Sequence, residues 1–172
     1  MSPSISQSLM RIAILYIAAA ILTINADASP LFRQNNHHVA FNLGFVDALQ
    51  REYVGFGMGY RYFPIDGVEI GMDFDLLLGN NPLIYTVSPE IRYVFYPLKT
   101  FVPYVGAYYQ YNYINNMENR GGLGARAGFY TPLGPQVYIA YGVSLGELTQ
   151  CNDTEYGDCS TARIELSIAL SF

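Results

Sequence analysis

Residues 54–62 alternate strictly between large apolar and small side chains, and this pattern constrains the fold more than any other feature. The large positions are Val54, Phe56, Met58, Tyr60 and Tyr62, and the positions between them hold three glycines and Arg61. Successive side chains of a β-strand point to opposite faces of its sheet. A period of two therefore predicts a strand with one apolar face and one small, polar face.

The same alternation recurs in eight segments. These are residues 38–46, 53–63, 67–78, 84–96, 103–114, 122–131, 136–146 and 162–172. Tight turns rich in Pro and Gly are expected at residues 64–67, 97–100 and 132–135, and longer polar loops at residues 47–52, 79–83, 115–121 and 147–161. Short turns at one end and long loops at the other predict an antiparallel up-and-down meander. The first and last strands would then pair and close a barrel.

The character of the two faces indicates which one is inside. In a soluble sandwich or a lipocalin-like barrel, the apolar face would form the core and the small face would meet water. Only 13% of the residues are charged, about half of the ~25% of globular proteins, and the small face is rich in glycine, which suits the inside of a narrow barrel. No later stretch is long enough for a helical span. We therefore expect the apolar face to contact lipid.

Charged side chains within the strands fall on the small face. The predicted lumen charge network consists of Arg61, Glu69, Asp73, Asp75, Glu90, Arg92, Arg126, Arg163 and Glu165. Four bases and five acids nearly neutralise one another, as buried charges must. An Arg on the lipid face near the bilayer centre would cost about 2–4 kcal/mol, which explains the lack of charge on that face.

Aromatic residues gather near the ends of the predicted strands and predict two interfacial girdles. The girdle by the short turns would contain Tyr62, Phe63, Phe95, Tyr96, Phe101, Tyr104, Phe129, Tyr130 and Phe172, and the girdle by the long loops Tyr85, Tyr111 and Tyr113. Pro89 lies inside a predicted strand, where it lacks an N–H for the ladder. We expect a bulge or bend there.

Residues 1–28 have the organisation of a cleaved signal peptide. Arg11 precedes an uncharged apolar run at residues 12–24, and small residues at positions 26 and 28 fit a peptidase site. A membrane anchor is the alternative, but the run is shorter than the ~20 residues that a spanning helix needs. The barrel domain would then comprise residues 29–172. The net charge of −5 argues against a nucleic-acid partner.

The pattern resembles the small eight-stranded outer-membrane β-barrels of Gram-negative bacteria, the group of the outer-membrane protein A transmembrane domain and outer-membrane proteins X and W. The resemblance is carried by the alternating last strand ending in Phe172 and by residues 88–93 and 103–107. It implies an all-β transmembrane barrel in the outer membrane, in contact with lipid and lipopolysaccharide. It also implies that Ile168, Leu170 and Phe172 form a signal for the barrel-assembly machinery. Activity is not implied, because relatives include structural proteins, adhesins, narrow conduits and lipid A enzymes.

The longest predicted loop contains Cys151 and Cys159. Outside the cell the compartment is oxidising, so we expect a disulfide between them. The same loop carries Glu147, Asp153, Glu155 and Asp158. These carboxylates could hold a divalent cation against lipopolysaccharide phosphates, but a solvated acidic loop is the favoured interpretation.

Catalytic signals are weak. His37 and His38 begin the first strand without a matching serine motif, so we interpret them as ordinary polar residues at a strand end. The carboxylates Glu69, Asp73 and Asp75 share their face with arginines and indicate salt bridges. We expect a non-enzymatic barrel without cofactor or metal, which displays loops for envelope integrity, surface interaction or adhesion and for an extracellular ligand. A narrow conduit for small or hydrophobic solutes and a lipid A-modifying enzyme are the alternatives.

Overall fold

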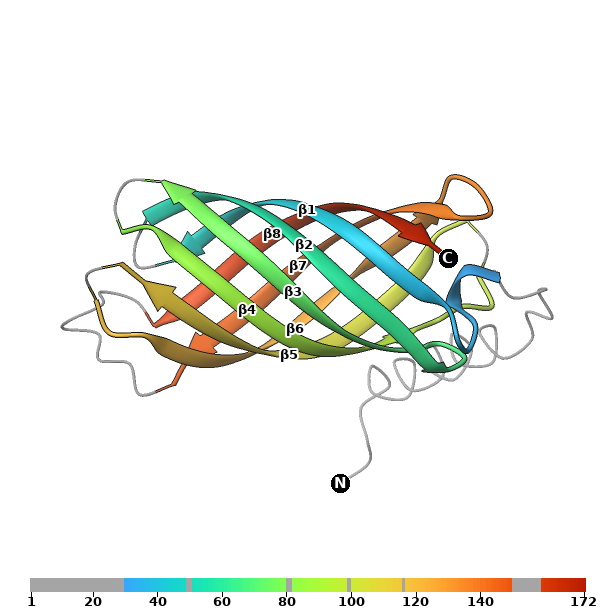
Figure 1. The fold of residues 1–172 in the computed structure, drawn as a ribbon, viewed down its shortest axis with the longest axis horizontal. Helices are drawn as coiled ribbons and strands as arrows, with labels where there is room; N and C mark the ends of the chain where they lie inside the picture. Colours follow the sequence, from blue (N-terminus) through green and yellow to red (C-terminus); the bar gives the residue numbers. More distant parts are fainter. Residues whose placement is uncertain (1–29, 49–50, 80–81, 99, 116, 150–158) are drawn as a thin grey trace, which may run out of the picture.

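A computed structural model describes residues 30–172 except 49–50, 80–81, 99, 116 and 150–158. Its eight strands form one closed antiparallel barrel in the order of the chain, as the sequence predicted. Figure 1 shows an elongated barrel whose strands are tilted against its long axis. A short 3-10 helix, η1, precedes the first strand. The elements are η1 Pro30–Phe32, β1 His37–Ala48, β2 Arg51–Ile65, β3 Val68–Gly79, β4 Ile84–Val94, β5 Val102–Ile114, β6 Arg120–Pro132, β7 Val137–Leu148 and β8 Ser160–Ser171.

The strand bounds differ from the predicted ones by no more than two residues. The predicted signal peptide lies outside the described residues. Within the described part of the chain, no helix is long and apolar enough to cross a membrane.

Two of the predicted connections are wrong. The loop expected at residues 47–52 is shorter, because β1 and β2 continue as a ladder in which Asp47 pairs with Glu52. The tight turn expected at residues 97–100 is part of a longer connection, since β4 ends at Val94 and β5 begins at Val102. At residues 47–52 the polar side chains do not prevent the backbone from continuing the ladder with its neighbouring strand. At residues 95–101 the ladder is not continued, and Pro97 has no N–H to donate to one. Composition alone therefore misjudged both lengths.

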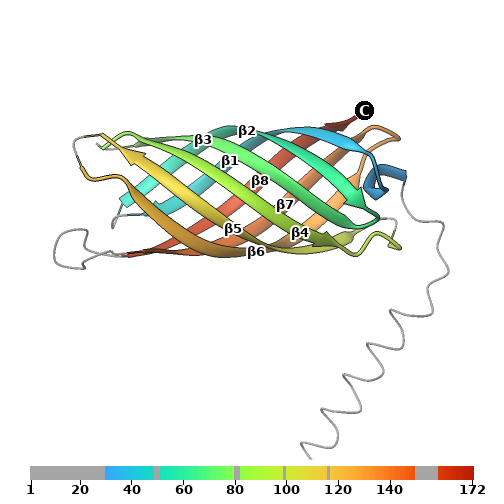
Figure 2. The ribbon, with the colours of Figure 1, turned by 60° about the horizontal axis from the view of Figure 1, so that its bottom comes forward.

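The barrel has two distinct ends. We call the end where β1 begins and β8 ends the terminal end; it also carries the connections at residues 66–67, 95–101 and 133–136. The opposite loop end carries the connections at residues 49–50, 80–83, 115–119 and 149–159. Figure 2 shows the same separation from another side.

The seam between β1 and β8 closes the barrel as expected. Val39 pairs with Leu170 and Phe45 with Ile164. At the terminal end, the N–H of Phe172 donates to the carbonyl of His37 at 3.0 Å, and the N–H of His37 donates back at 3.2 Å. The sheet consequently has no free edge, which is the condition for a β-structure in lipid.

Of the bulge or bend predicted at Pro89, the bulge is absent. On either side of it, Val87 pairs with Tyr111 and Glu90 with Tyr108, so the register between β4 and β5 is unchanged. The missing N–H interrupts the ladder without inserting a residue. A register shift is found instead between Tyr62 and Ile65, beside Pro64.

The faces have the predicted inverted arrangement. Every strand contributes large apolar side chains to the outside, where they are about half exposed. Examples, one from each strand in order, are Phe41, Met58, Phe74, Ile91, Val105, Leu123, Val143 and Leu166. The predicted charge network lies on the inner face. This outer wall is an apolar surface suited to lipid rather than to water.

The aromatic girdle at the terminal end is only partly as predicted. Phe101, Phe129 and Phe172 are exposed on the outside. In contrast, Phe63, Tyr104 and Tyr130 are buried in the interior with at most 2% exposure. These three have the wrong parity for the lipid face, because each shares the inner face of its strand with an arginine or glycine. At the loop end, Tyr85 and Tyr113 are exposed as expected.

The outer wall predicts a depth-dependent effect of charge. Leu166→Arg, near the middle of β8, should lower the free energy of unfolding in lipid bilayers by about 2–4 kcal/mol, because the guanidinium would face lipid tails. Leu133→Arg, in the exposed β6–β7 connection, should cost no more than about 1 kcal/mol. Urea titration of folding into liposomes, followed by the mobility difference between unboiled and boiled protein on a gel, measures both. Equal costs would contradict the membrane orientation.

Candidate functional site

The interior of the barrel is filled by three layers of side chains. An aromatic layer lies at the terminal end, a charged layer in the middle and an apolar layer at the loop end. The three layers contain every inward-facing residue that the sequence marked as a candidate. The lumen is therefore the first place to ask what the protein can do.

Arg61 lies at the centre of the charged layer. Its Nη2 lies 2.8 Å from Asp73 Oδ1, and its Nε lies 2.9 Å from Glu69 Oε1 and 3.0 Å from Glu90 Oε1. These four side chains come from β2, β3 and β4 and are almost completely buried. One guanidinium thus bridges three carboxylates across three strands.

Arg92 and Arg126 extend this contact set. Arg92 Nη2 lies 2.8 Å from Glu90 Oε1, and Arg126 Nη1 lies 2.8 Å from Glu90 Oε2 and 3.1 Å from Asp73 Oδ2. Arg126 also approaches Glu165 at 3.6 Å, which links β8. Each guanidinium lies over a tyrosine ring, Arg92 over Tyr104 and Arg126 over Tyr108. Seven of the nine predicted residues form one connected network.

The other two predicted residues form a separate pair. Arg163 Nη1 donates to Asp75 Oδ2 at 2.7 Å. Arg163 is partly exposed, whereas the arginines of the main network are buried. The sequence therefore identified the members correctly but not their division into a cluster and a pair.

Two glycines on β2 make room for this layer. A Cβ at Gly57 would collide with the carboxylate of Asp75, and a Cβ at Gly59 with the carboxylate of Asp73. The paired positions in the β2–β3 ladder are Gly57 with Asp75 and Gly59 with Asp73. The alternation of glycine and large residues in β2 is thus the complement of the acidic face of β3.

The terminal layer contains a segment that the sequence analysis missed. Leu31 and Phe32 insert into the barrel and are 2% and 0% exposed. Residues 33–36 then turn at the rim, where Asn35 has a φ of 68° and its N–H donates to the carbonyl of Phe63. An apolar pair directly before the first strand was the available signal. We call residues 31–36 the strap.

His38 is a buried residue that fastens the strap, so its interpretation as an ordinary strand-end residue was wrong. Its Nε2 lies 2.8 Å from the carbonyl oxygen of Leu31, which can only accept, so Nε2 donates. Its Nδ1 lies 2.8 Å from the hydroxyl of Tyr138. Because both ring nitrogens are engaged, His38 is not a free general base. His37 lies outside and contacts the rings of Tyr62 and Phe172.

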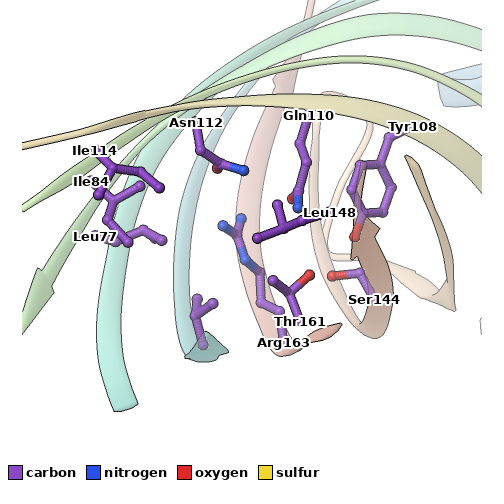
Figure 3. A pocket seen from close by; sticks show the side chains of 11 residues that line it. Leu77, Ile84, Tyr108, Gln110, Asn112, Ile114, Ser144, Leu148, Thr161 and Arg163 are labelled. Carbon is purple, nitrogen blue, oxygen red and sulfur yellow. The ribbon is translucent and has the colours of Figure 1, made fainter. Parts of the chain in front are cut away.

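The loop-end layer closes the other side. Its core consists of Val46, Tyr53, Leu77, Ile84 and Ile114. Beneath it lies a cavity of about 30 Å³, lined on one side by apolar residues and on the other by polar ones such as Gln110, Asn112 and Arg163 (Figure 3). That volume admits no more than a few water molecules. Within the described residues, no group of three or more His, Cys, Asp or Glu side chains is placed to hold a metal ion.

A closed barrel with an apolar outer wall and a charged, filled interior defines an integral-membrane β-barrel. No family model and no curated protein matches the sequence. Among solved structures, the barrel is similar to Neisserial surface protein A (12% identity over 80% of this chain and 96% of that one, TM-score 0.63). It is also similar to the N-terminal β-barrel domain of Pseudomonas aeruginosa OprF, with 17% identity over 81% of this chain and 98% of that one and a TM-score of 0.65. A third similar structure is Ail, the attachment invasion locus protein of Yersinia pestis, with 13% identity over 81% of this chain and 99% of that one and a TM-score of 0.52.

These likenesses establish the fold. It is the fold of the small eight-stranded outer-membrane barrels, as the sequence predicted. The predicted location in the outer membrane of a Gram-negative bacterium agrees with this fold and with the apolar outer wall.

The charged layer predicts a large effect of removing one guanidinium. Arg126→Met should destabilise the barrel by about 3–5 kcal/mol, because Asp73, Glu90 and Glu165 would lose a buried counter-ion. Arg33→Met is the control, because Arg33 is exposed at the terminal end and its replacement should change stability by no more than about 0.5 kcal/mol. Urea-dependent unfolding in lipid vesicles measures both. Similar values for the two variants would contradict a cooperative network.

Proposed function

We propose that the protein is a non-enzymatic integral outer-membrane barrel that displays its loop-end connections for envelope integrity, surface interaction or adhesion. The observation that supports this most strongly is the sealed interior. Phe32 closes the terminal end, the arginine–carboxylate cluster crosses the middle, and an apolar layer covers the loop end. With the lumen filled, the external connections are the part that can contact a partner.

A narrow conduit is the weaker alternative. An eight-stranded barrel has an interior that side chains just fill. A solute would have to separate Arg61, Arg92 and Arg126 from carboxylates that lie within 3 Å of at least one guanidinium nitrogen each. Breaking such buried pairs is strongly unfavourable. Steady conduction through the resting barrel is therefore not expected.

The β7–β8 connection, residues 149–159, is the principal candidate for display. Its base is fixed to the barrel, because the N–H of Leu148 donates to the carbonyl of Cys159 and the N–H of Thr149 donates to the carbonyl of Gly121, both at 2.8 Å. Cys151 lies outside the described residues, so the disulfide with Cys159 stays a prediction. A disulfide would limit the conformations of a loop held on a rigid stem.

Two of the similar structures support a surface role. One is described as a surface protein and another as an attachment invasion locus protein. For this chain we propose an equivalent exposure of loops to an extracellular ligand, with outer-membrane lipid and lipopolysaccharide around the wall.

The last strand fits the proposed assembly signal. Ile168 and Leu170 face outward on β8, Phe172 follows directly after it, and all three are about half exposed or more. They lie on the seam with β1, where the barrel-assembly machinery would find them before closure. We propose this machinery as the partner that inserts the chain.

Replacing residues 150–158 with a short Gly/Ser linker tests the proposed function. Gram-negative cells that express the variant should bind less well to an extracellular ligand, or resist detergent less well, than cells that express the wild type. The mobility difference between unboiled and boiled protein on a gel should persist, because the barrel itself is unchanged. Cys151→Ser together with Cys159→Ser should weaken the same property less. Leu133→Ser, at the opposite end, is the control.

Two outcomes would count against this proposal. If the linker variant retains every wild-type surface property, this loop is not the functional element. If lipid A from expressing cells shows an altered acyl-chain pattern by mass spectrometry, the protein is an enzyme rather than a display barrel.

The sealed lumen also predicts electrical behaviour. Purified protein in planar bilayers should show no steady single-channel steps, because the charged layer crosses the lumen. Steady steps that disappear in Arg92→Ala or Glu90→Ala would show a path through the network and would favour the conduit.

A further inference from the structure

The terminal end of the barrel contains a chamber that is built by the strands and filled by the tip of the strap. Four strands supply its aromatic walls, and three alanines leave room beside them. The wall residues are His38 and Ala40 from β1, Phe63 from β2, Tyr130 from β6, Tyr138 and Ala140 from β7 and Ala169 from β8. All three alanines are buried. Leu31 and Phe32 belong to the same buried cluster.

The Phe32 ring has the surroundings of a bound aromatic ligand. It stacks on Tyr130, with ring centroids 5.2 Å apart and planes inclined by 20°. Tyr138 meets it edge-on at 5.5 Å and His38 at 6.2 Å. One stacked ring combined with edge contacts is the favourable geometry for recognising a planar aromatic group.

The walls are held by contacts that do not involve the Phe32 side chain. The hydroxyl of Tyr130 accepts a hydrogen bond from Arg92 at 2.7 Å and donates to Glu69 at 3.0 Å, so the charged layer fixes this ring. Tyr138 is fixed by its bond to the imidazole of His38. The backbones of these residues belong to the closed ladder. The chamber should therefore keep its shape when the tip is altered.

The strap itself is outside the barrel ladder. Its rim is attached by the N–H of Asn35 to the carbonyl of Phe63, and by the N–H of Phe63 to the carbonyl of Asn36. Its tip is attached by the carbonyls of Leu31 and Phe32, which accept bonds from His38 and from the N–H of Gly67. Phe32 is thus an occupant of the chamber that a short strap delivers, and no part of the wall depends on its ring.

We propose that this chamber is a binding site for a planar aromatic group of benzene to toluene size, which Phe32 occupies as a built-in competitor. A free aromatic solute would take the place of the ring, with its face on Tyr130 and its edge toward the alanines. Apolar cavities of this kind, lined by large side chains, stay dry and bind small aromatic molecules.

The test compares Phe32→Ala with the wild type and uses toluene as the probe. Toluene should raise the temperature at which the folded gel band of Phe32→Ala is lost, in a saturable manner. Its affinity for the variant should exceed that for the wild type by more than about tenfold, because the competing ring is gone. Methylcyclohexane, of similar size but not planar, should act more weakly. Arg33→Ala, on the exposed side of the strap, should behave like the wild type.

Several results would overturn the proposal. These are a folded Phe32→Ala protein that toluene does not stabilise, equal effects of toluene on Phe32→Ala and Arg33→Ala, or equal effects of toluene and methylcyclohexane. If Phe32→Ala does not fold, Phe32→Val retains more apolar volume and is assessed by the same criteria. Fluorine NMR of a fluorinated toluene gives a second readout, in which only a variant with a vacated chamber should show a slowly exchanging bound signal.

Discussion

The pairing of β1 with β8 is the constraint on which the other features depend. Lipid offers no partner for backbone N–H and C=O groups, so a sheet persists there only when it has no edge. The seam from Val39 with Leu170 to Phe45 with Ile164 removes the last two edges. Once the sheet is closed, each side chain has either lipid or the lumen before it. The two faces of every strand then acquire opposite chemistry.

The narrow lumen determines what the inner face can contain. Glu69, Asp73 and Glu90 are buried against three arginines, and the less buried Glu165 contacts Arg126. Such a cluster fits because glycines on β2 leave space opposite Asp73 and Asp75. The cluster connects β2, β3, β4, β6 and β8 and is covered by an aromatic and an apolar layer. A filled interior of this kind leaves variation and contact with partners to the connections outside the membrane.

Parity along each strand could be predicted, because a pleated strand alternates regardless of its neighbours. For this reason the nine charged residues were placed correctly on the inner face, and Leu166 and Phe172 on the outer one. The prediction failed where a second argument replaced parity. Phe63, Tyr104 and Tyr130 were assigned to a girdle by their position near the strand ends, although their parity pointed inward. Connection lengths were also misjudged, since Asp47 and Glu52 pair as a ladder despite their polar character.

By itself, the sequence determined the strand number, the strand phase and the inverted distribution of apolar and charged residues, because these follow from a local period of two. Only the tertiary structure decided which charges touch, that Arg163 and Asp75 form a separate pair, and that Leu31 and Phe32 fill the terminal end. These contacts join residues far apart in the chain, such as His38 and Tyr138. They depend on the shear and closure of the whole barrel, which no local pattern encodes.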